Sequence, residues 1–466
     1  MAQAMNWPER LQQNPLTAKG AGILSLVRRM EAFQWWDPEN IEAEQFKALS
    51  KLLGHARKTI PHYAGTLKSI KNINAKSLPD GAWQDVPVLS RASVNEAGDR
   101  LMSKASPKKH GGLDPIYTSG TTGRPVRVIR TSHALQYWSA FTVRDHIWHD
   151  RDLADSLAVI RSSEKDFAVY PAGAGHMFWG AVSIFKSGPA FSLNVNTPIP
   201  DMAEWLVRTN PGYFMTLPNI MKRLAPYCRD HGISVPNLKE THVHGEVCTD
   251  FIRDAVRDAW DVAVHDMYTS REIGYMALQC PEHEHYHVQA EGVLLEVLDD
   301  DDQPCKPGEI GRVVVTTLRN YAMPLIRYEL GDRAELGEPC PCGRGLPVVK
   351  RIIGREQDVL VLPDGTQRWT LLGSPDVKEL MAMAPIRQYQ FAHVAPEVIE
   401  VRLGISRELS EHESAEIRTF VHKKFGYPFT VQFQCADELP RTPAGKFRDF
   451  VREMPPPNTA GGIAST

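Results

Sequence analysis

Apolar residues recur at helical spacing in two parts of the chain. Between residues 41 and 64 they recur every three or four positions, at Phe46, Leu49, Leu52, Leu53 and Ala56. Between residues 131 and 160 the pattern is aromatic, with Tyr137, Trp138, Phe141 and Trp148. Both patterns predict helices, and we expect most of the aromatic side chains of the second helix to lie in the core.

Strand patterns follow in the middle of the chain, and strands alternate with helix towards its end. Residues 291–298 and 311–318 are apolar runs of strand length, and the acidic, proline-containing segment between them predicts a solvated hairpin tip. Further apolar runs at 398–403 and 430–433 flank a helical stretch at 411–425. Near residues 351–365 the pattern changes to a short strand, a charged loop and another apolar run that ends in a turn. We place a domain boundary there, around Asp358.

The length of 466 residues exceeds one ordinary core and predicts a large domain plus a smaller one. We expect an α/β (α+β) fold with a large N-terminal domain of β-sheets flanked by helices and a small, mobile C-terminal α+β domain. The boundaries predicted are 1–354 for the large domain, 355–358 for the hinge and 359–454 for the small domain. Residues 455–466 contain three prolines and paired glycines, and we expect them to be disordered.

Charge and hydropathy exclude several classes of partner. A formal net charge of -3 gives no electrostatic footprint for nucleic acid or an anionic membrane. No segment reaches the roughly 18 apolar residues of a transmembrane helix, and the first residues lack the apolar core of a signal peptide. We therefore expect a cytoplasmic protein, a monomer or homodimer, whose partners are small molecules.

The most informative segment is 117–125, Tyr-Thr-Ser-Gly-Thr-Thr-Gly-Arg-Pro. Closely spaced hydroxyl side chains and two glycines let the backbone approach a polyphosphate, with amide and hydroxyl hydrogens directed at its oxygens. Flanking apolar residues such as Ile116 and Val126 argue against a flexible linker. The segment lacks the Gly-Lys-Ser/Thr ending of a P-loop, so magnesium and a neutralising cation must come from elsewhere.

Residues 119–125 resemble the phosphate loop of the adenylate-forming superfamily of acyl-CoA synthetases, adenylation domains and luciferases. Further matches follow in the family's order, from residue 55 to residue 446. The subfamily resembled is phenylacetate-CoA ligase, on the motifs His-Ala-Arg at 55–57, Pro-His-Tyr at 61–63 and Met-Pro-Leu-Ile-Arg-Tyr at 323–328, and on a cysteine/histidine cluster.

The resemblance implies roles for the nucleotide-binding residues. Phosphate contacts are implied for Ser119, Gly120, Thr121, Thr122 and Gly123, with Thr121 also catalytic. The adenine side is implied for Gly245, Glu246 and Tyr268, with Thr269 and Ser270 beside the nucleotide. Glu272 would bind Mg²⁺, for which a carboxylate is the usual protein ligand, and Asp332 would accept hydrogen bonds from both ribose hydroxyls.

The resemblance also implies a movable lid. Arg355 would contact the nucleotide, and Asp358 would permit rotation of the small domain, so that one active site serves two half-reactions. Lys446, in a Pro-Arg-Thr-Pro-Ala-Gly-Lys loop, would bridge the carboxylate and the α-phosphate, because a charge on a flexible stem suits the developing negative charge.

Arg271 departs from the family pattern, which usually has Thr or Ser at this position. A cation there has two alternative partners. It would contact phosphate or substrate, or it would form a salt bridge with the neighbouring Glu272 in the resting state.

Cysteine and histidine residues form a second group of candidate functional residues. The chain has seven cysteines, an odd number that does not favour a framework of disulfides. The candidate ligands are Cys280, His287, Cys340 and Cys342. Thiolates and an imidazole fit tetrahedral zinc, and four protein ligands would make the site structural. His283 or His285 would be alternatives to His287, and the resemblance favours His287.

The acid pocket is expected near residues 170–180, where aromatic side chains alternate with glycines and would leave a flat slot for an aryl acid. The candidates are Tyr170, Gly173, His176, Phe178, Trp179 and Gly180, together with Gly245. His176 is a candidate polar anchor for a substituent on the substrate ring.

The expected function is ATP-dependent activation of a carboxylic acid, with an aryl acid favoured, through acyl-AMP with release of pyrophosphate. The resemblance implies coenzyme A as the acceptor. After Asp358, however, the sequence Val-Leu-Val-Leu-Pro-Asp-Gly-Thr-Gln-Arg-Trp replaces the family's glycine-asparagine turn, so an amine or a carrier-protein thiol remains an alternative acceptor. The remaining alternative is a nucleotide-binding protein without catalysis.

Overall fold

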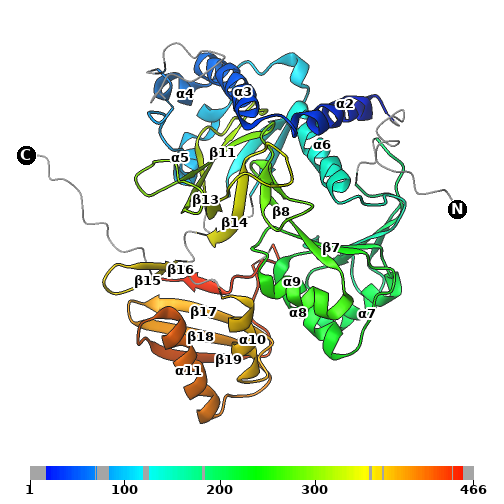
Figure 1. Ribbon diagram of the computed structural model, residues 1–466, viewed down its shortest axis with the longest axis vertical. Helices are drawn as coiled ribbons and strands as arrows, with labels where there is room; N and C mark the ends of the chain where they lie inside the picture. Colours follow the sequence, from blue (N-terminus) through cyan, green and yellow to red (C-terminus); the bar gives the residue numbers. More distant parts are fainter. Residues whose placement is uncertain are drawn as a thin grey trace, which may run out of the picture.

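The computed structural model describes residues 17–68, 70, 83–118, 125–180, 184–355, 359–369, 372–442 and 444–454. Figure 1 shows a large body, coloured blue to yellow, and a smaller body of orange and red elements beside it. The predicted fold class is confirmed: a large domain of β-sheet flanked by helices is followed by a small α+β domain. Within the described residues, no helix is long and apolar enough to cross a membrane.

The helix predicted within residues 41–64 is confirmed, and it ends before Pro61, as expected for a breaker. Helix α3 (Pro38–Thr59) ends there and α4 (Pro61–Thr66) begins, because proline is tolerated in the first turn of a helix but not in its interior. The predicted core positions Leu49, Leu52 and Leu53 are fully buried. The other helical elements before the sheet are α2 (Ala18–Phe33), α5 (Arg91–Ala97) and the short 3₁₀ turns η1 (Gly98–Leu101) and η2 (Lys108–His110).

The predicted aromatic helix is α6 (Ser132–Trp148), and it packs against α2. Thr131 caps it, because its hydroxyl accepts a hydrogen bond from the Ala134 amide. Phe141 and Trp148 are buried, as expected, whereas Tyr137 and Trp138 are only half-buried. The expectation of a core position is thus correct for the second half of this helix only.

A twelve-stranded sheet runs through the large domain in the order β11-β12-β13-β14-β10-β9-β8-β7-β6-β3-β5-β4. The six of its strands that come first in the chain form one half of the sheet. They are β3 (Leu157–Arg161), β4 (Ala174–His176), β5 (Ala190–Asn194), β6 (Tyr213–Thr216), β7 (Glu240–His244) and β8 (Ala263–Ser270). All but the edge strand β4 are parallel. The helices of this half are α7 (Ile199–Thr209), α8 (Pro218–Asp230) and α9 (Asp250–Trp260). Helix α8 packs against β7, α9 against β8, and α7 against α8.

The second half of the sheet is antiparallel. It contains β9 (Gly274–Gln279), β10 (Tyr286–Val288), β11 (Val293–Leu298), β12 (Ile310–Thr317), β13 (Tyr328–Leu336) and β14 (Val348–Arg355). Strands β11 and β12 pair as the predicted hairpin. Asp299 accepts hydrogen bonds from two backbone amides at its tip, and Arg312 and Arg333 pair with Asp302 and Asp300, so arginines offset part of the charge of this acidic turn.

The small domain is built on a four-stranded sheet in the order β19-β18-β17-β20. Its elements are β15 (Val359–Val361), β16 (Gln367–Trp369), α10 (Ser374–Ala382), β17 (Gln388–Ala395), β18 (Val398–Gly404), α11 (Glu411–Phe425), β19 (Thr430–Ala436) and β20 (Phe450–Arg452). Ser410 and Glu413 form a capping box and Gly426 takes the left-handed conformation, which is why α11 has the boundaries predicted from sequence.

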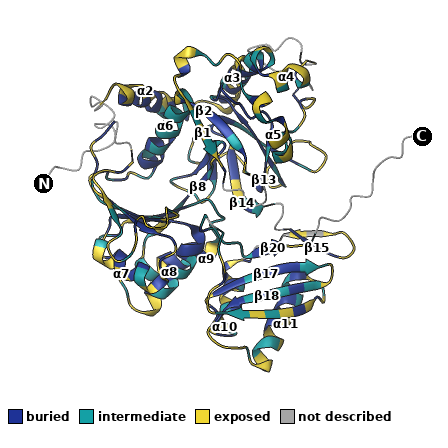
Figure 2. Cartoon of the chain, turned by 180° about the vertical axis from the view of Figure 1, so that it is seen from behind, coloured by how far each residue is buried: buried dark blue, intermediate teal, exposed yellow. Residues whose placement is uncertain are grey.

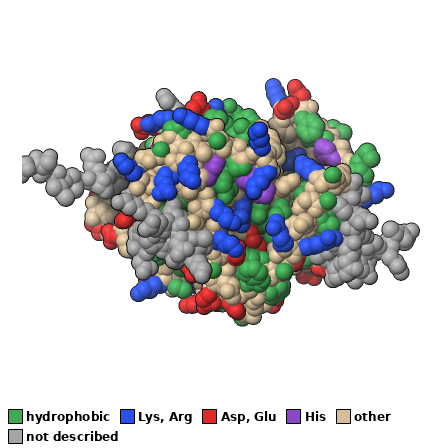
Figure 3. Space-filling view, turned by 90° about the horizontal axis from the view of Figure 1, so that it is seen from above, with side chains coloured by type: hydrophobic (Ala, Val, Ile, Leu, Met, Phe, Trp, Pro, Cys, Tyr) green, Lys and Arg blue, Asp and Glu red, His purple; other side chains and the backbone are tan. Residues whose placement is uncertain are grey.

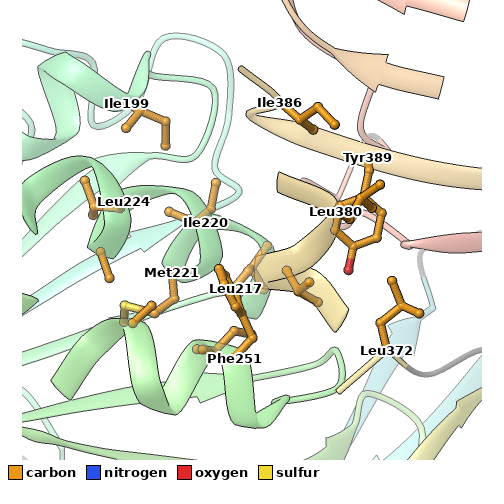
Figure 4. Packing of buried hydrophobic residues seen from close by; sticks show 14 of the residues in the cluster. Ile199, Leu217, Ile220, Met221, Leu224, Phe251, Leu372, Leu380, Ile386 and Tyr389 are labelled. Carbon is orange, nitrogen blue, oxygen red and sulfur yellow. The ribbon is translucent and has the colours of Figure 1, made fainter. Parts of the chain in front are cut away.

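One hydrophobic cluster joins the two domains. Figure 4 shows Leu217, Ile220 and Phe251, from the region of α8 and α9, close to Leu380 and Tyr389 of the small domain. Figure 2 shows that strands of both sheets are largely buried, while exposed positions concentrate on helices and loops. Apolar packing therefore fixes the small domain against the helices that flank β7, where the candidate site lies.

Candidate active site

The strands on either side of the predicted phosphate loop, β1 (Leu113–Tyr117) and β2 (Arg127–Thr131), pair as an antiparallel hairpin. Thr118 closes its base: its amide donates to the Val126 carbonyl at 3.0 Å, and its hydroxyl accepts from the Val126 amide and from Arg91, each at 2.9 Å. Residues 119–124 lie outside the described part of the chain. The phosphate contacts implied for residues 119–123 therefore stay a prediction.

Tyr268, Asp332 and Arg355 come together from three strands of the sheet. The Tyr268 hydroxyl donates to Asp332 Oδ2 at 2.9 Å, and Arg355 Nε lies 2.8 Å from Asp332 Oδ1. Asp332 and Arg355 are cross-strand partners of β13 and β14. Burial and the negative charge of Asp332 raise the pKa of Tyr268 well above its usual value, so Tyr268 remains a hydrogen-bond donor. The carboxylate is thus held in one orientation.

Lys446 reaches from the small domain into the large one. Its Nζ donates to the Gly245 carbonyl at 2.6 Å, in the loop after β7. Burial lowers the pKa of Lys446. Gly245 has a φ of 80°, a left-handed conformation that favours glycine, so this residue lets the turn present its carbonyl to Lys446.

Glu246 is held by a residue that sequence reasoning missed. The Asn219 side chain donates to both carboxylate oxygens, at 2.8 and 2.9 Å, and the Phe447 amide donates to Oε1 at 2.7 Å. Burial raises the pKa of Glu246, although these hydrogen bonds act in the opposite direction. No local motif marks Asn219. It is the second residue of α8, and it reaches Glu246 because β6 and β7 are adjacent.

Arg271 and Glu272 follow β8 directly, and their side chains have different surroundings. Arg271 Nη1 donates to the Tyr117 carbonyl at 3.2 Å, at the base of the phosphate-loop hairpin. Within the described residues, no ion pair joins Arg271 to Glu272. Glu272 is 7% exposed. Thr269 and Ser270 end β8 in front of this turn, while Asp358 lies outside the described residues.

The predicted acid-binding segment lies at the edge of the sheet. β4 is separated from β7 by β6, β3 and β5. Tyr170 donates to Glu204 at 2.8 Å, His176 lies 3.2 Å from the Ser192 hydroxyl, and Trp179 is buried and donates to the Asp155 carbonyl. The glycines 173 and 180 both have positive φ, while Phe178 is 38% exposed. Their role in acid binding stays a prediction.

A small cavity lies directly beside Glu272. Tyr137, Trp138 and Phe141 of α6 line it, together with Gly274 and Gly292. A Cβ at Gly292 would be 2.8 Å from the Phe141 ring, so the missing side chains make room for the aromatic ones. Sequence reasoning placed these aromatic residues in the core. Helical periodicity identifies an apolar face, but it does not distinguish a core from the wall of a cavity.

The cysteine and histidine residues do come together. Cys280, His285, His287 and Cys340 have ligand atoms within 4.8 Å of one another, and Cys342 Sγ lies 3.4 Å from His287 Nε2. Soft thiolate and imidazole donors in a mostly buried cluster fit zinc. The structure therefore brings together all four predicted ligands, and it places His285, which was predicted as an alternative to His287, in the same cluster.

Comparisons with known proteins give a consistent result. The profile of the AMP-binding enzyme family matches residues 58–320. The phenylacetate-coenzyme A ligase of Thermus thermophilus is 29% identical over 336 residues, covering 70% of this chain and 72% of that protein. Protein CapK of Staphylococcus aureus is 22% identical over 429 residues, covering 88% of this chain and 89% of that protein.

A solved structure shares the fold over nearly the whole chain. A crystal structure of 2-hydroxyisobutyryl-CoA ligase in complex with 2-HIB-AMP has a TM-score of 0.67 at 18% sequence identity, and the match covers 97% of this chain and 93% of that one. A crystal structure of the anthranilate CoA ligase AuaEII in complex with anthranoyl-AMP has a TM-score of 0.53 at 15% identity, covering 71% of this chain and 65% of that one.

Proposed function

Because the chain belongs to the family of AMP-binding enzymes, we propose that it is an ATP-dependent, AMP-forming acid–thiol ligase. In the first step a carboxylate oxygen attacks the α-phosphorus of ATP, the bond to the β-phosphate breaks, and pyrophosphate leaves. In the second step a thiol attacks the acyl carbon, and AMP leaves with the electron pair. The named phenylacetate-coenzyme A ligases support an aryl acid and coenzyme A as substrates.

The observation that carries the proposal is the hydrogen bond from Lys446 of the small domain to the Gly245 carbonyl, in the loop after β7. A half-buried ammonium next to a backbone turn is suited to a charge that grows during the reaction, because partly desolvated surroundings strengthen its attraction for the α-phosphate. Lys446 is the only one of the proposed catalytic groups that the small domain supplies. Its position supports a reaction that needs both domains in contact.

The other residues would bind and orient the nucleotide. Asp332, with both oxygens already aligned by Tyr268 and Arg355, would accept from the ribose hydroxyls through its remaining lone pairs. Magnesium would neutralise phosphate charge, and Glu272 is the residue proposed to hold it. Arg271, directed at the base of the phosphate-loop hairpin, supports the phosphate-side alternative rather than a resting salt bridge with Glu272.

The zinc proposal is separate from the chemistry. A cluster with four or five candidate protein ligands leaves no position for a substrate, so we propose a structural ion held by Cys280, Cys340, His287 and either Cys342 or His285.

Acid-dependent release of pyrophosphate tests the function. We would supply ATP and Mg²⁺ with a panel of aryl and alkyl acids, and compare the wild type with Lys446→Ala and with Lys423→Ala, an exposed lysine on α11, as the control. Loss of a preorganised charged donor lowers turnover by roughly 10²- to 10³-fold, so Lys446→Ala should fall by that amount and the control should not.

The acceptor is tested in the same assay. Trapped acyl-AMP should be consumed on addition of coenzyme A, with a thioester as product. If an amine or a carrier-protein thiol consumed it faster, the acceptor would be corrected. If no acid in the panel released pyrophosphate while ATP still bound, the non-catalytic alternative would replace the proposal.

A further inference from the structure

A cavity of about 290 Å³ lies between α2, α3 and residues 290–291, away from the candidate active site. We call it the α2–α3 cavity. It approaches the roughly 300–1,000 Å³ of small-molecule sites, whereas the cavity beside Glu272 has only about 40 Å³. The described residues that line the α2–α3 cavity include no proposed catalytic or nucleotide-binding residue. A molecule bound there would therefore be a ligand other than the acid that is activated.

The walls of the α2–α3 cavity are largely apolar. Leu26, Met30 and Phe33 line it from one face of α2, since they are four and three residues apart along the helix. Trp36 and Ala290 add further apolar area. Leu26 and Met30 are buried, whereas Trp36 is exposed, so the cavity reaches the surface of the molecule. An apolar tail in this cavity would be removed from water, which favours its binding.

Two guanidinium groups line the same cavity, those of Arg29 and Arg319. Within the described part of the chain, no carboxylate forms an ion pair with either of them. The carboxylates in the wall have partners of their own: Glu291 pairs with Arg144 at 2.6 Å, and Glu44 pairs with a lysine of α3 at 2.8 Å. The charges that the wall offers to a ligand are therefore positive.

Arg319 is held in a position that suits a carboxylate. Its Nε donates to the Glu291 carbonyl at 2.5 Å, and its guanidinium carbon lies 5.1 Å from the centre of the Tyr137 ring. Because these contacts fix the plane of the guanidinium through Nε and its face, a carboxylate would bind to the two terminal nitrogens. Two parallel hydrogen bonds of this kind are the strong form of arginine–carboxylate recognition.

His133 reports the positive potential at this end of the cavity. Its ring lies 5.3 Å from that of Tyr137. Burial and the positive charges of its neighbours, Arg319 and Arg29 among them, lower the pKa of His133 to about 4. Figure 3 views the molecule from the side of α2 and α3, and basic side chains gather near the middle of this face. An anion would lower the potential there.

We propose that the α2–α3 cavity is a second ligand site, which binds a small amphiphilic anion with its carboxylate on Arg319 and Arg29 and its apolar tail against α2. The ligand class is a carboxylic acid with an uncharged alkyl or arylalkyl tail. The positive wall disfavours a cationic ligand, and the apolar wall disfavours an anion without a tail. The site is separate from the candidate active site, so this inference does not depend on the proposed function.

Isothermal titration calorimetry with octanoate tests the site. A non-hydrolysable mimic of phenylacetyl-AMP is present throughout, so that the active site is occupied. Hexanoate has two methylenes fewer, and its Kd should be roughly tenfold higher than that of octanoate. Octylammonium has the same tail and the opposite charge, and it should bind at least roughly tenfold more weakly. Equal binding of octanoate and octylammonium would overturn the proposal.

Two variants locate the tail and the carboxylate. Ala32 lines the cavity from an exposed position of α2, so Ala32→Trp should fill it and raise the Kd for octanoate roughly tenfold. Ser25→Trp, exposed on the same helix but outside the cavity, should leave the Kd unchanged. Arg29→Gln removes a charged donor and should also raise the Kd roughly tenfold, whereas Arg28→Gln, next to it but outside the lining, should not.

Three results would overturn the proposal. The first is the absence of octanoate binding to the wild type. The second is wild-type affinity for octanoate in both Ala32→Trp and Arg29→Gln. The third is a wild-type dimer that becomes a monomer in Ala32→Trp, measured by light scattering, because the cavity would then be covered by a second copy of the chain.

Discussion

Asp332 has a separate partner for each carboxylate oxygen, Tyr268 and Arg355. Asp332→Asn keeps the size of the side chain but removes the charge that binds both partners and that, in the proposed function, would bind the ribose hydroxyls. Hydrogen bonds to charged groups contribute about 1.5–3 kcal/mol, so the Kd for ATP should rise roughly 10- to 150-fold. Isothermal titration calorimetry with ATP measures this rise.

Tyr268→Phe is the matched comparison for Asp332→Asn. It removes one hydroxyl and leaves the carboxylate charged, so the Kd for ATP should rise much less. ATP affinity of Asp332→Asn equal to that of the wild type would exclude Asp332 from nucleotide binding.

At the scale of single residues, the sequence identified groups that belong to recognisable motifs. Asp332, Arg355, Tyr268 and Lys446 were all selected in this way, and the structure brings the first three into contact. Asn219 was missed, because its partner Glu246 is 27 residues away and only the neighbouring positions of β6 and β7 join them. The partner of Arg271 was left open for the same reason, since Tyr117 is 154 residues distant.

The cysteine/histidine cluster joins β9 and β10 to the loop after β13, so a bound ion should stabilise this part of the sheet. Cys280→Ser removes one thiolate and should abolish stoichiometric zinc in the purified protein, measured by elemental analysis. A ligand that binds only the native state adds about 2.7 kcal/mol at a hundredfold excess over Kd, so chelation should lower the free energy of unfolding by a similar amount.

Two further variants decide the fourth zinc ligand. His285→Asn and Cys342→Ser should differ, with zinc lost only in the variant that removes a true ligand. Cys435→Ser, outside the cluster, serves as the control. Full zinc content in Cys280→Ser would contradict the site.

The end of α6 and strand β8 contribute a buried ionic network outside the candidate site. Arg151 pairs with Asp145 and Glu240, and the rings of His149 and His265 lie 3.8 Å apart. Burial lowers the pKa of His149 and of His265 to about 3. Both imidazoles are therefore neutral in the folded protein at any pH above about 3.

These histidines make stability fall in mild acid. Their folded pKa is depressed, so below the unfolded value of about 6.5 the unfolded chain binds more protons, and stability is lost progressively as pH falls from there towards about 3. Each should cost about 1 kcal/mol of unfolding free energy between pH values of roughly 7.5 and 5.5. Denaturant titrations should show a smaller loss for His149→Phe than for the wild type.

His412→Phe is the control for this pH effect, because His412 is exposed on α11. Its pH dependence should match that of the wild type. An equal loss of stability in His149→Phe and the wild type would show that other groups govern the acid response.

At the scale of elements, predictions succeeded where local signals were complete. The boundaries of α11 follow from its capping box and its terminal glycine, and the β11–β12 hairpin from two apolar runs and a polar turn. The edge position of β4 was not predictable, because strand order depends on crossovers between distant segments. The acid pocket was therefore assigned to a segment whose place in the sheet was unknown.

Across the whole molecule, the contact between the domains combines the apolar cluster with a few polar contacts. Lys222 of α8 pairs with Asp449 at 2.5 Å, and its Nζ lies 3.9 Å from the centre of the Tyr389 ring. Partly exposed pairs of this kind contribute about 0.2–1 kcal/mol, so Lys222→Ala should slow acid-dependent pyrophosphate release by up to roughly fivefold.

Transfer from supplied acyl-AMP to the acceptor should not slow in Lys222→Ala, because that half-reaction is expected to use another orientation of the small domain. Stopped-flow assays of the two half-reactions separate these effects. Equal slowing of both would indicate a general loss of folding, which Lys423→Ala should not show.

The two-domain architecture was predictable from the length of the chain and from the change in the pattern of apolar and charged residues near residue 358. The way the domains meet was not. The apolar side chains of α8, α9 and α10 carry the same signal as any core residue, so only the structure shows that Leu380 packs towards Leu217 and Phe251 (Figure 4).

The loop that carries Cys340 and Cys342 continues directly to the corner between α2 and α3. The Gly345 amide donates to the Gln34 carbonyl at 2.9 Å, and a Cβ on Gly345 would lie only 1.9 Å from the Trp36 carbonyl oxygen. A metal bound by Cys340 and Cys342 would therefore hold the corner between α2 and α3 in place, as well as the strands next to the cluster.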